Sequence, residues 1–446
     1  MKTTRRNFVK KTTLSSAGLA LGGMAMGLSP KSYKGIIGAN DRLNVAVMGT
    51  NSRGAHLARV FQNASGASVS YICDVDKRVL DETVKNVHEH SGSMPKASTD
   101  IRRVLDDQDV DVLVIAAPDH WHAPASIMAL NAGKNVYVEK PCSQNPLEGE
   151  MLVISQRKHG KIVQMGNQQR SSPESIEIIR EIHNGIIGDV YSAYTWYSNQ
   201  RKSIGNGKVV PVPDWLDWEL WQGPAPRRDF HDNYVHYNWH WFWHWGTGET
   251  CNNATHELDI ARWALGVNFP SKVEVVGARN FYKDDDWEMY DTLNASFQFE
   301  DGKSITWDGQ SCNGLGKWGR SRGAVIYGTK GSVLVDRNIY ILYDLAGKPI
   351  KTVSAESRSA TTDLVGAGGN DDRHVHNFLE TIRGKAEIQN SPINEGHKSV
   401  LLCHLANIAY RTGKDLHCDP KNGHIKNNAA MKLWGRKYEK KWEPLV

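Results

Sequence analysis

The residues from 49 to 54 form a glycine-rich turn that could bind a phosphate-containing ligand. The turn reads Gly-Thr-Asn-Ser-Arg-Gly, follows the apolar run 43–48 and precedes a helical pattern that begins near residue 55. Glycines there let the backbone turn tightly and approach a pyrophosphate at the helix N-terminus. Asn51 replaces the middle glycine of the usual Gly-x-Gly-x-x-Gly motif, and asparagine tolerates positive φ better than most residues. The candidate cofactor-binding residues of this turn are Gly49, Asn51, Ser52, Arg53 and Gly54.

A carboxylate about twenty residues further along the chain supports this interpretation. Asp74 follows a second strand-like run, 69–73. A carboxylate there can accept hydrogen bonds from the hydroxyls of an adenosine ribose, which favours NAD as the cofactor. Lys77 and Arg78 lie just beyond it and could instead contact the 2′-phosphate of NADP, so the choice of cofactor stays open. The alternative for Asp74 is a simple turn residue.

Alternating strands and helices are expected to position these residues. The apolar runs 110–118 and 135–138 follow the first two strands, with an Ala- and Leu-rich helical segment between them. This alternation predicts an α/β fold with a doubly wound parallel sheet of the Rossmann type, over residues 38–162. Ligands bind such sheets beyond the carboxyl ends of the strands. Pro118 and His122 fall at that edge and are further candidate cofactor-binding residues.

The rest of the chain, residues 163–446, has a different pattern. Strand-like runs that mix polar and apolar residues occur at 190–197, 272–277, 290–299, 303–307, 323–327 and 332–343. They predict an α+β domain with a large, open and mostly antiparallel sheet. We expect this second domain to bind the substrate.

Tryptophan stands at every second position of the segment 238–245, which reads Asn-Trp-His-Trp-Phe-Trp-His-Trp. Aromatic rings stack on the apolar face of a pyranose while His and Asn bind its hydroxyls, so the segment is a candidate sugar-binding wall, with Trp243 as its candidate substrate-binding residue. The alternative is a strand edge whose rings pack across the domain junction. The histidines have no acidic neighbour in a familiar ligand spacing, so no metal is predicted.

The N-terminal stretch predicts export. A basic patch with the pair Arg5-Arg6, followed by Phe8 and Lys10, precedes a mildly apolar run from about residue 14 to residue 28. This pattern resembles a twin-arginine signal peptide and is too short and too weakly apolar to span a membrane. We therefore expect residues 1–30 to direct the protein to the periplasm; a basic tail is the alternative.

Composition excludes several other classes of protein. The Lys and Arg residues of the segment 1–30 account for the whole net charge of +5, so the remaining chain is close to neutral. Hence no nucleic-acid partner is predicted. No later segment has the length and apolar composition of a transmembrane span, so stable membrane insertion is not predicted either. The six cysteines are scattered without a Cys-x-x-Cys pair, and free buried thiols are expected for most of them.

The triplet Glu139-Lys140-Pro141 directly follows the strand at 135–138. At this point the chain resembles the Gfo/Idh/MocA oxidoreductases, NAD(P)-dependent enzymes that act mostly on sugars and cyclitols. The resemblance covers nearly all of the chain after the N-terminal stretch. The other matching segments, in the family's order, are 49–54, 73–76, 117–122, 132–136, 188–190, 221–226, 255–264 and 376–378.

The resemblance implies catalytic roles for two residues. Lys140 corresponds to a lysine beside the nicotinamide and the reacting carbinol, and a lysine in a partly desolvated cleft can accept the hydroxyl proton as hydride leaves carbon. His256 corresponds to a histidine that faces the cleft from a helix of the second domain and can bind a substrate hydroxyl. Many relatives carry an aspartate four residues before this histidine, where this chain has Asn252. Since an amide cannot take a proton, Lys140 and His256 would have to suffice.

The resemblance also implies the remaining contacts and partners. Glu139 would contact the cofactor, and Arg170 and Asn252 would contact a sugar, glycoside or cyclitol substrate; Arg170 could instead contact a cofactor phosphate or be a solvated surface residue. His374 and His376 begin a helical pattern, and either could face the cleft. The sheet of the second domain would mediate a homo-oligomer, a dimer or a tetramer.

Export in the folded state suggests that NAD, or NADP as the second possibility, stays bound through turnover.

There are two alternatives to a dehydrogenase function. A similar group, family 109 of the glycoside hydrolases, uses bound NAD to oxidise a sugar transiently, eliminate the aglycone and restore the hydride. Its members lack the lysine of the triplet, so Lys140 favours the dehydrogenase. A non-catalytic sugar-binding protein would be expected to have lost Lys140 or His256, and both are present.

Overall fold

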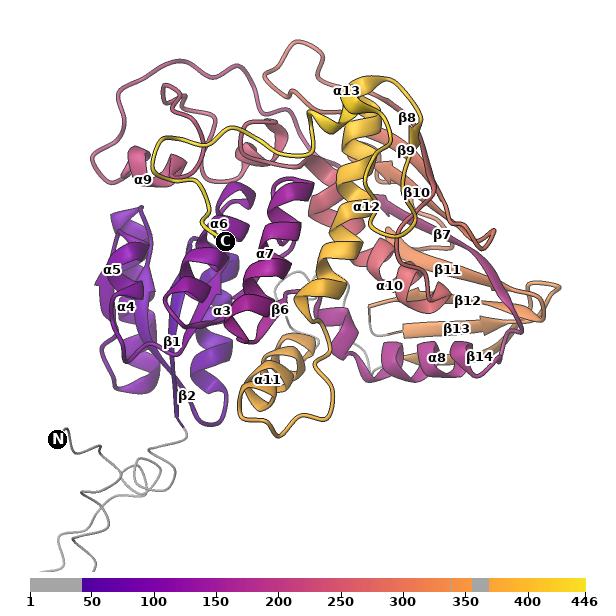
Figure 1. Cartoon of the computed structure of the whole chain (residues 1–446), viewed down its shortest axis with the longest axis horizontal. Helices are drawn as coiled ribbons and strands as arrows, with labels where there is room; N and C mark the ends of the chain where they lie inside the picture. The colour runs from indigo at the N-terminus through magenta and orange to yellow at the C-terminus, as the bar shows by residue number, and fades with distance from the viewer. Residues whose placement is uncertain (1–41, 338, 355–368) are drawn as a thin grey trace, which may run out of the picture. The chain divides into compact units, whose positions relative to one another are not determined.

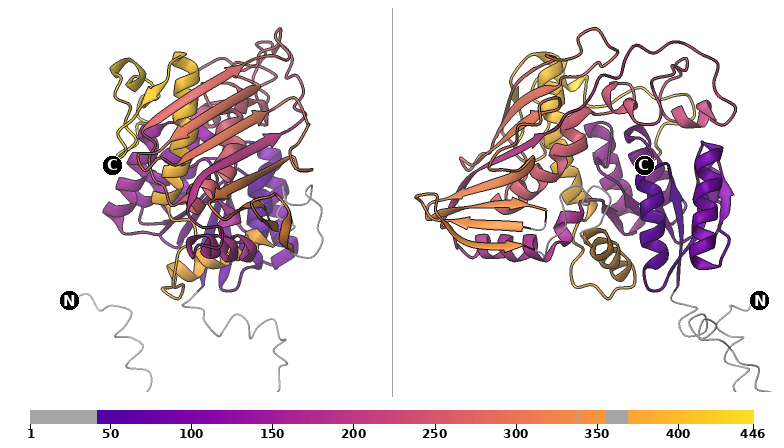
Figure 2. Two further views of the ribbon diagram at one scale, coloured as in Figure 1. Left: turned by 90° about the vertical axis from the view of Figure 1, so that its right-hand side faces the viewer. Right: turned by 180° about the vertical axis from the view of Figure 1, so that it is seen from behind.

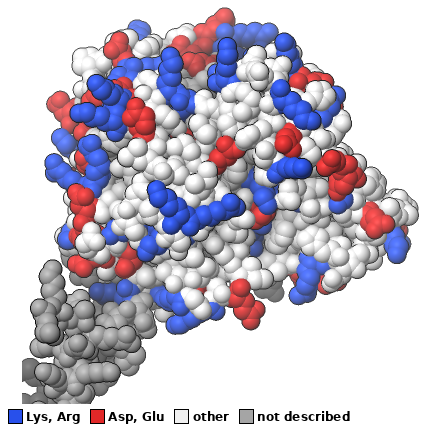
Figure 3. Space-filling view, in the orientation of Figure 1, with Lys and Arg blue, Asp and Glu red and all other residues white. Residues whose placement is uncertain are grey.

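The computed structural model describes residues 42–337, 339–354 and 369–446, and the expected signal segment 1–30 lies outside them. Within these ranges, no helix is long and apolar enough to cross a bilayer. All six cysteines are free thiols. Basic and acidic side chains are interspersed on the face of the protein that Figure 3 shows.

The N-terminal part is a six-stranded parallel sheet with the order β3-β2-β1-β4-β5-β6. Its strands are β1 (Leu43–Met48), β2 (Ala67–Cys73), β3 (Lys96–Ser98), β4 (Val112–Ile115), β5 (Asn135–Val138) and β6 (Val163–Met165). Its helices are α3 (Arg53–Asn63), α4 (Lys77–Ser91), α5 (Ile101–Leu105), α6 (Asp119–Asn131) and α7 (Pro146–His159) (Figure 1). Separate apolar clusters cover the two faces, which explains the continuous apolar runs of the central strands. The predicted Rossmann fold is confirmed, but its sheet extends to Met165, beyond the boundary expected at 162.

The second part is built on a nine-stranded sheet with the order β14-β13-β12-β11-β7-β10-β9-β8-β15. Neighbouring strands are antiparallel except β7 and β10, which are parallel. The strands are β7 (Val190–Ser198), β8 (Lys272–Ala278), β9 (Thr292–Gln298), β10 (Ser304–Gln310), β11 (Arg322–Gly328), β12 (Gly331–Asp336), β13 (Ile339–Tyr343), β14 (Pro349–Ser354) and β15 (Leu416–His417). The predicted open, mostly antiparallel sheet is therefore confirmed.

Helices pack on one face of this sheet and leave the other open (Figure 2). The described helices of this part are α8 (Pro173–His183), α9 (Trp218–Gln222), α10 (Thr255–Leu265), α11 (Asn370–Ile382), α12 (Ile393–Thr412) and α13 (Asn428–Met431), with the 3₁₀ turns η1 (Gln168–Ser171) and η2 (Asn238–Trp241). Apolar residues of α8, α10 and α12 form one core with the inner face of the sheet. A single π-helical turn, η3 (Thr250–Ala254), runs directly into α10, and such turns often occur at functional sites.

One C-terminal helix returns to the nucleotide-binding sheet. Phe378 of α11 packs edge-on against Phe61 of α3 and Tyr137 of β5. Val375 and Leu379, on the same face of α11, belong to the same apolar cluster. The Rossmann part is thus completed by residues from far along the chain.

The segment from residue 199 to residue 249, called the covering segment here, has little regular structure. Its tryptophans do not form the strand edge that their alternation suggested, because residues 238–241 adopt a 3₁₀ turn. Trp241 stacks on Trp287, with ring centroids 4.2 Å apart, and Trp245 packs against Trp218. These rings need an apolar environment, and burying them against each other folds the segment without strands or long helices.

Candidate active site

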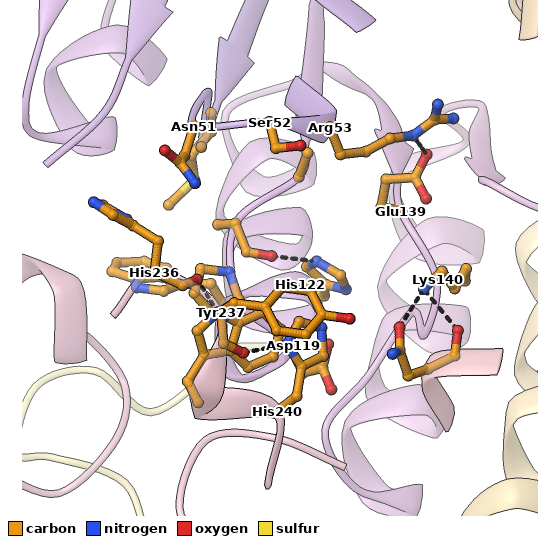
Figure 4. A pocket seen from close by; sticks show the side chains of 18 of the residues that line it. Asn51, Ser52, Arg53, Asp119, His122, Glu139, Lys140, His236, Tyr237 and His240 are labelled. Carbon is orange, nitrogen blue, oxygen red and sulfur yellow. Dashed lines mark hydrogen bonds and ion pairs between the residues drawn. The ribbon is translucent and has the colours of Figure 1, made fainter. Parts of the chain in front are cut away.

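A cavity of about 460 Å³ lies beyond the carboxyl ends of the parallel strands, where ligands bind doubly wound sheets. Both parts of the fold and the covering segment line it. Figure 4 shows Asn51, Ser52 and Arg53 on one side of this cavity, opposite Tyr237 and His240. The sequence-predicted residues in the cavity wall are Gly49, Asn51, Ser52, Arg53, Asp74, Pro118, His122, Glu139, Lys140, Asn252 and His256.

The glycine turn forms a cradle that only glycine allows. Gly49 has a φ of +79°, and a Cβ there would lie 2.6 Å from the backbone nitrogen of Ala117. A Cβ on Gly54 would lie 1.8 Å from the carbonyl oxygen of Gly49, so Gly54 lets α3 start close to the turn rather than lining the cavity itself. The Ser52 side chain makes no capping hydrogen bond to α3. Its hydroxyl and the first-turn amides of α3 are therefore suited to a pyrophosphate.

Asp74 lies at the end of β2 and is fixed by backbone donors. One carboxylate oxygen accepts a hydrogen bond from the Thr50 amide at 2.5 Å, and the other accepts one from the Asp76 amide at 2.9 Å. Burial raises the pKa of Asp74, and these hydrogen bonds oppose that effect. Lys77 and Arg78 do not line the cavity, so neither is placed to contact a 2′-phosphate there. The described residues thus form a cradle that fits NAD, with a ribose-binding carboxylate beside a phosphate-binding turn.

Lys140 follows β5 and points toward the π-helical turn of the second part. Its Nζ donates to the backbone oxygen of Asn252 at 2.8 Å and to Oδ1 of the same residue at 3.0 Å (Figure 4). Burial lowers the pKa of Lys140, while the nearby carboxylates of Glu139 and Asp119 oppose that effect. A lysine whose charged form is disfavoured in this way is suited to hold a proton only transiently.

His256 reaches the cavity from the first turn of α10, across from the nucleotide-binding part. Burial lowers the pKa of its ring well below the ordinary value, and the positive charges of Arg337, Arg322 and Lys140 lower it further. The ring is therefore neutral at neutral pH. A neutral imidazole can hydrogen-bond a hydroxyl as donor or acceptor.

Two other predicted residues shape the cofactor side of the cavity. The ring nitrogens of His122 lie 2.5 Å from the Pro141 carbonyl oxygen and 2.7 Å from that of Ala117, so His122 ties the turn after β5 to the end of β4. Glu139 accepts hydrogen bonds from Arg53 and from Gln168, both at 2.9 Å. Glu139 thereby fixes the start of the turn that carries Lys140.

Two predicted substrate-binding residues lie outside the cavity wall. Arg170 donates two hydrogen bonds to Asp259, at 2.7 and 2.9 Å, and both side chains are buried. A buried guanidinium needs such a carboxylate partner, which explains why Arg170 points away from the cavity. Trp243 packs under the guanidinium of Arg411, 4.9 Å from its ring centroid. The structure therefore corrects the prediction that Arg170 and Trp243 bind the substrate, since neither lines the cavity.

The two C-terminal histidines are not in the cavity wall either. His374 is buried, with its ring nitrogens 2.7 Å from the Ser171 hydroxyl and 2.9 Å from the Met165 carbonyl oxygen. His376 also lies outside the wall. Within the described ranges, no group of His, Cys, Asp and Glu side chains has the arrangement of a metal site.

The structure adds Tyr237 to the cavity wall and shows which residues of the candidate wall 238–245 reach it. Tyr237 is 47% exposed, lines the cavity and accepts a hydrogen bond on its hydroxyl from Arg201 at 2.6 Å. Trp239 also lines the cavity, but one face of its ring is covered by His240, with ring centroids 3.6 Å apart. The accessible aromatic surface is thus a tyrosine rather than a tryptophan. The other polar residues of this side are Asn199, Arg201, His236, His240 and Asn253.

Comparison with known families identifies the class of protein. Residues 43–167 match the model described as "Oxidoreductase family, NAD-binding Rossmann fold", and residues 186–444 match its "C-terminal alpha/beta domain". The chain therefore belongs to the Gfo/Idh/MocA oxidoreductase family, and its N-terminal part is an NAD-binding Rossmann domain.

Similar proteins include both hydrolases and dehydrogenases. A glycosyl hydrolase family 109 protein of Saccharopolyspora erythraea is 24% identical over 226 residues, 47% of this chain and 49% of that protein. The chain thus spans about half the length of the curated relatives it matches. The aldose-aldose oxidoreductase of Caulobacter crescentus, solved with glycerol, is 18% identical with a TM-score of 0.62, covering 84% of this chain and 99% of that one. A levoglucosan dehydrogenase, solved with NADH and levoglucosan, is 18% identical with a TM-score of 0.63 and the same coverages. These two structures show a shared fold.

Proposed function

We propose that this protein is an NAD-dependent oxidoreductase that transfers hydride between a hydroxyl-bearing carbon of a sugar and the nicotinamide. The observation that carries the proposal is the meeting of Lys140 and His256 in one cavity with the dinucleotide cradle. Bound nicotinamide supplies the hydride acceptor and donor. The residues of the chain supply binding, orientation and the proton transfer that must accompany loss of hydride from an alcohol.

Each polar residue near Lys140 has a distinct proposed role. Lys140 accepts the hydroxyl proton during oxidation and returns it during reduction. Asn252 holds the Lys140 ammonium group in place through its two oxygen acceptors. His256, neutral because of burial and nearby cations, hydrogen-bonds the reacting or the neighbouring hydroxyl. Acid–base assistance of this kind contributes about 10²- to 10⁴-fold to a rate.

A sugar is the substrate class that best fits the cavity wall. The wall opposite the cradle combines amide, hydroxyl, imidazole and guanidinium groups with one exposed ring, Tyr237. Polar groups of this kind bind several hydroxyls, while an aromatic ring stacks on the apolar face of a pyranose. The substrates named for the solved oxidoreductases of the same fold, an aldose and levoglucosan, support this class.

We also propose that NAD stays bound through turnover in the periplasm, after export directed by residues 1–30. The support is the way the covering segment joins the end of β2. The Asp217 amide donates to the Val75 carbonyl at 3.0 Å, and the Lys77 amide donates to the Trp215 carbonyl at 2.9 Å. His236 Nε2 lies 2.9 Å from Asp76. These contacts bound the cavity beside Asp74, where the adenosine would lie.

A homo-oligomer, dimer or tetramer, is proposed through the open face of the nine-stranded sheet. On this face a small apolar cluster, with Trp196, Val325 and Leu334 buried at its centre, presents the partly buried Tyr327, Ile341 and Tyr343 at its surface, and Trp318, which packs against Trp196, is 51% exposed. Burial of such a patch stabilises association. Light scattering at several concentrations tests it: a monomer at micromolar concentration would contradict the proposal.

A redox-neutral glycosidase of the family 109 type is the second candidate. The favouring observation is the identity of 24% to a family 109 protein over about half of each chain. Lys140 favours the dehydrogenase, because the resemblance stated above associates the lysine of the Glu-Lys-Pro triplet with the dehydrogenases.

One experiment separates the two functions. The purified protein is mixed with NAD and a panel of free sugars and of nitrophenyl glycosides, and the absorbance of reduced nicotinamide and of released nitrophenol is followed. The dehydrogenase predicts reduced nicotinamide with at least one free sugar. Release of nitrophenol without net reduction would establish the glycosidase and contradict the first proposal.

A further inference from the structure

A buried carboxylate, Glu249, lies behind Lys140 and outside the cavity wall. Glu249 is 2% exposed and immediately precedes the π-helical turn η3. Its carboxylate accepts hydrogen bonds from Arg201 Nε at 3.0 Å and Arg201 Nη2 at 3.3 Å. It also accepts hydrogen bonds from the side-chain amides of Asn252, at 3.4 Å, and Asn253. The Glu249 carboxylate therefore connects Arg201, in the cavity wall, to Asn252, which contacts Lys140.

The orientation of the Asn252 amide follows from its two charged neighbours, Lys140 and Glu249. A lysine ammonium group only donates hydrogen bonds, so the oxygen of the amide must face Lys140. A carboxylate only accepts them, so the NH₂ group must face Glu249. Both requirements are met, with Lys140 Nζ at 3.0 Å from Oδ1 and Glu249 Oε1 at 3.4 Å from Nδ2. The amide thus connects a cation and an anion and is polarised by both.

Asn252, the residue that contacts Lys140, is itself uncharged. In this chain the nearest carboxylate of that segment lies three residues earlier, at Glu249, and reaches the same lysine through the amide. The helical turn makes this connection local, because Asn252 and Asn253 lie one turn after Glu249 in the same segment.

We propose that Glu249 is the positioning residue of Lys140: it fixes the Asn252 amide against the lysine and supplies the negative charge that position 252 lacks. This inference rests on the proposed function, because it assigns Lys140 the proton transfer. Glu249 itself touches neither the cavity nor the substrate. Its effect on the reaction passes through Asn252, and its ion pair with Arg201 holds that guanidinium at the cavity wall.

The electrostatic consequence has a definite sign. Burial lowers the pKa of Lys140, and the carboxylates of Glu139, Asp119 and Glu249 oppose that effect while Arg322 adds to it. Removing the charge of Glu249 therefore lowers the pKa of Lys140 further. The charged or titratable groups with an electrostatic interaction with Lys140 include Asp119, Glu139, His240, Glu249, His256 and Arg322.

The Glu249→Gln variant tests the inference, since glutamine keeps the shape and removes the charge. Sugar oxidation needs neutral Lys140, so kcat/KM rises with pH through the pKa of this lysine. We expect Glu249→Gln to move this rising limb to lower pH by about half a unit to one unit, and Glu249→Asp to restore part of the shift. Glu148→Gln is the matched control, because Glu148 is a fully buried carboxylate paired with Arg436 at 2.7 Å and lies outside the cavity. An unmoved limb in Glu249→Gln, or an equal shift in Glu148→Gln, overturns the inference.

A measurement without substrate separates this inference from the proposed function. The protein is prepared with [ε-¹³C]lysine, and the Lys140 signal is assigned by its loss in Lys140→Met. We expect the chemical-shift titration of Lys140 to move to lower pH in Glu249→Gln and to stay unchanged in Glu148→Gln. That result upholds the positioning role of Glu249 even if no sugar reduces the cofactor. A failure of every sugar to reduce the cofactor would contradict only the proposed oxidoreductase function. An identical titration in wild type and Glu249→Gln overturns the role.

Discussion

The guanidinium of Arg53 donates two hydrogen bonds to the carboxylate of Asp371, at 2.9 and 2.6 Å, and so joins residues 318 positions apart in the chain. Arg53 begins α3 at the glycine turn, and Asp371 lies in the first turn of α11. The same carboxylate contacts His56 at 2.9 Å. The helix that returns from the second part of the chain therefore fixes the turn that is suited to hold the pyrophosphate.

The Asp371→Asn variant is expected to lose stability in a pH-dependent way. Burial raises the pKa of Asp371, but the hydrogen bonds from Arg53 and His56 outweigh it and hold the pKa well below its ordinary value. A depressed carboxylate pKa contributes stability above the unfolded-state value, about 4, and that contribution is lost as the pH falls through the folded-state value. We expect a loss of about 1–3 kcal/mol at neutral pH that shrinks below about pH 4. Urea unfolding of both proteins at several pH values measures it; a difference independent of pH would contradict the assignment.

The Gly54→Ala variant is expected to lose affinity for NAD. Its Cβ would lie 1.8 Å from the Gly49 carbonyl oxygen, so the turn must shift away from the geometry that receives a pyrophosphate. Gly92→Ala is the control, because Gly92 lies at the C-terminal end of α4, away from the turn, and no atom lies within 4 Å of an added Cβ; its φ is +74°. The control costs about 1 kcal/mol of backbone strain without changing the site. Titration calorimetry with NAD distinguishes them, and equal affinities would refute the proposed cradle.

The His236→Ala variant is expected to release NAD faster. His236 pairs with the buried Asp76 and helps to hold the covering segment over the end of β2. Loss of a contact of about 1.4 kcal/mol corresponds to a roughly tenfold faster dissociation. The rate is measured by trapping released NAD with a second dehydrogenase. His417→Ala, at an exposed position of β15, is the control; if both variants keep the wild-type rate, the covering segment does not retain the cofactor.

Tyr237 is expected to determine the binding of the sugar ring. Its ring is the exposed aromatic surface of the cavity wall, so Tyr237→Ala should raise KM for the sugar about tenfold with a smaller effect on kcat. Tyr237→Phe keeps the ring and loses the hydroxyl contacts with Arg201 and Asn252. Steady-state kinetics of both variants test this assignment. An unchanged KM in Tyr237→Ala would place the sugar elsewhere.

The cofactor side of the site could be predicted from the sequence because its residues follow local patterns. Gly49, Asp74, Pro118 and Lys140 each come within three residues of the end of an apolar strand of a parallel sheet, and the carboxyl ends of such strands meet at one edge. The local sequence is sufficient to predict these positions, because each residue lies close in the chain to the strand that positions it.

The substrate side could be predicted only in part, because long-range pairings decide it. Arg170 is held away from the cavity by Asp259, 89 positions later, and no local pattern indicates that pair. The covering segment has neither helical nor strand periodicity over most of its length, so its sequence could not distinguish the exposed Tyr237 from the buried tryptophans near it. Glu249 was missed for the same reason, since its role depends on contacts with Arg201 and Asn252 rather than on a motif.

The central claim is that hydride passes from a sugar carbon to a nicotinamide held beside Lys140. A single-turnover reaction with a sugar deuterated at its ring carbons, followed by mass spectrometry of the released cofactor, tests it directly. The account predicts reduced NAD that carries deuterium in the wild type, and bound but oxidised NAD in Lys140→Met. Wild-type protein that binds NAD and leaves it oxidised with every sugar, or a Lys140→Met variant that reduces NAD at the wild-type rate, would contradict it.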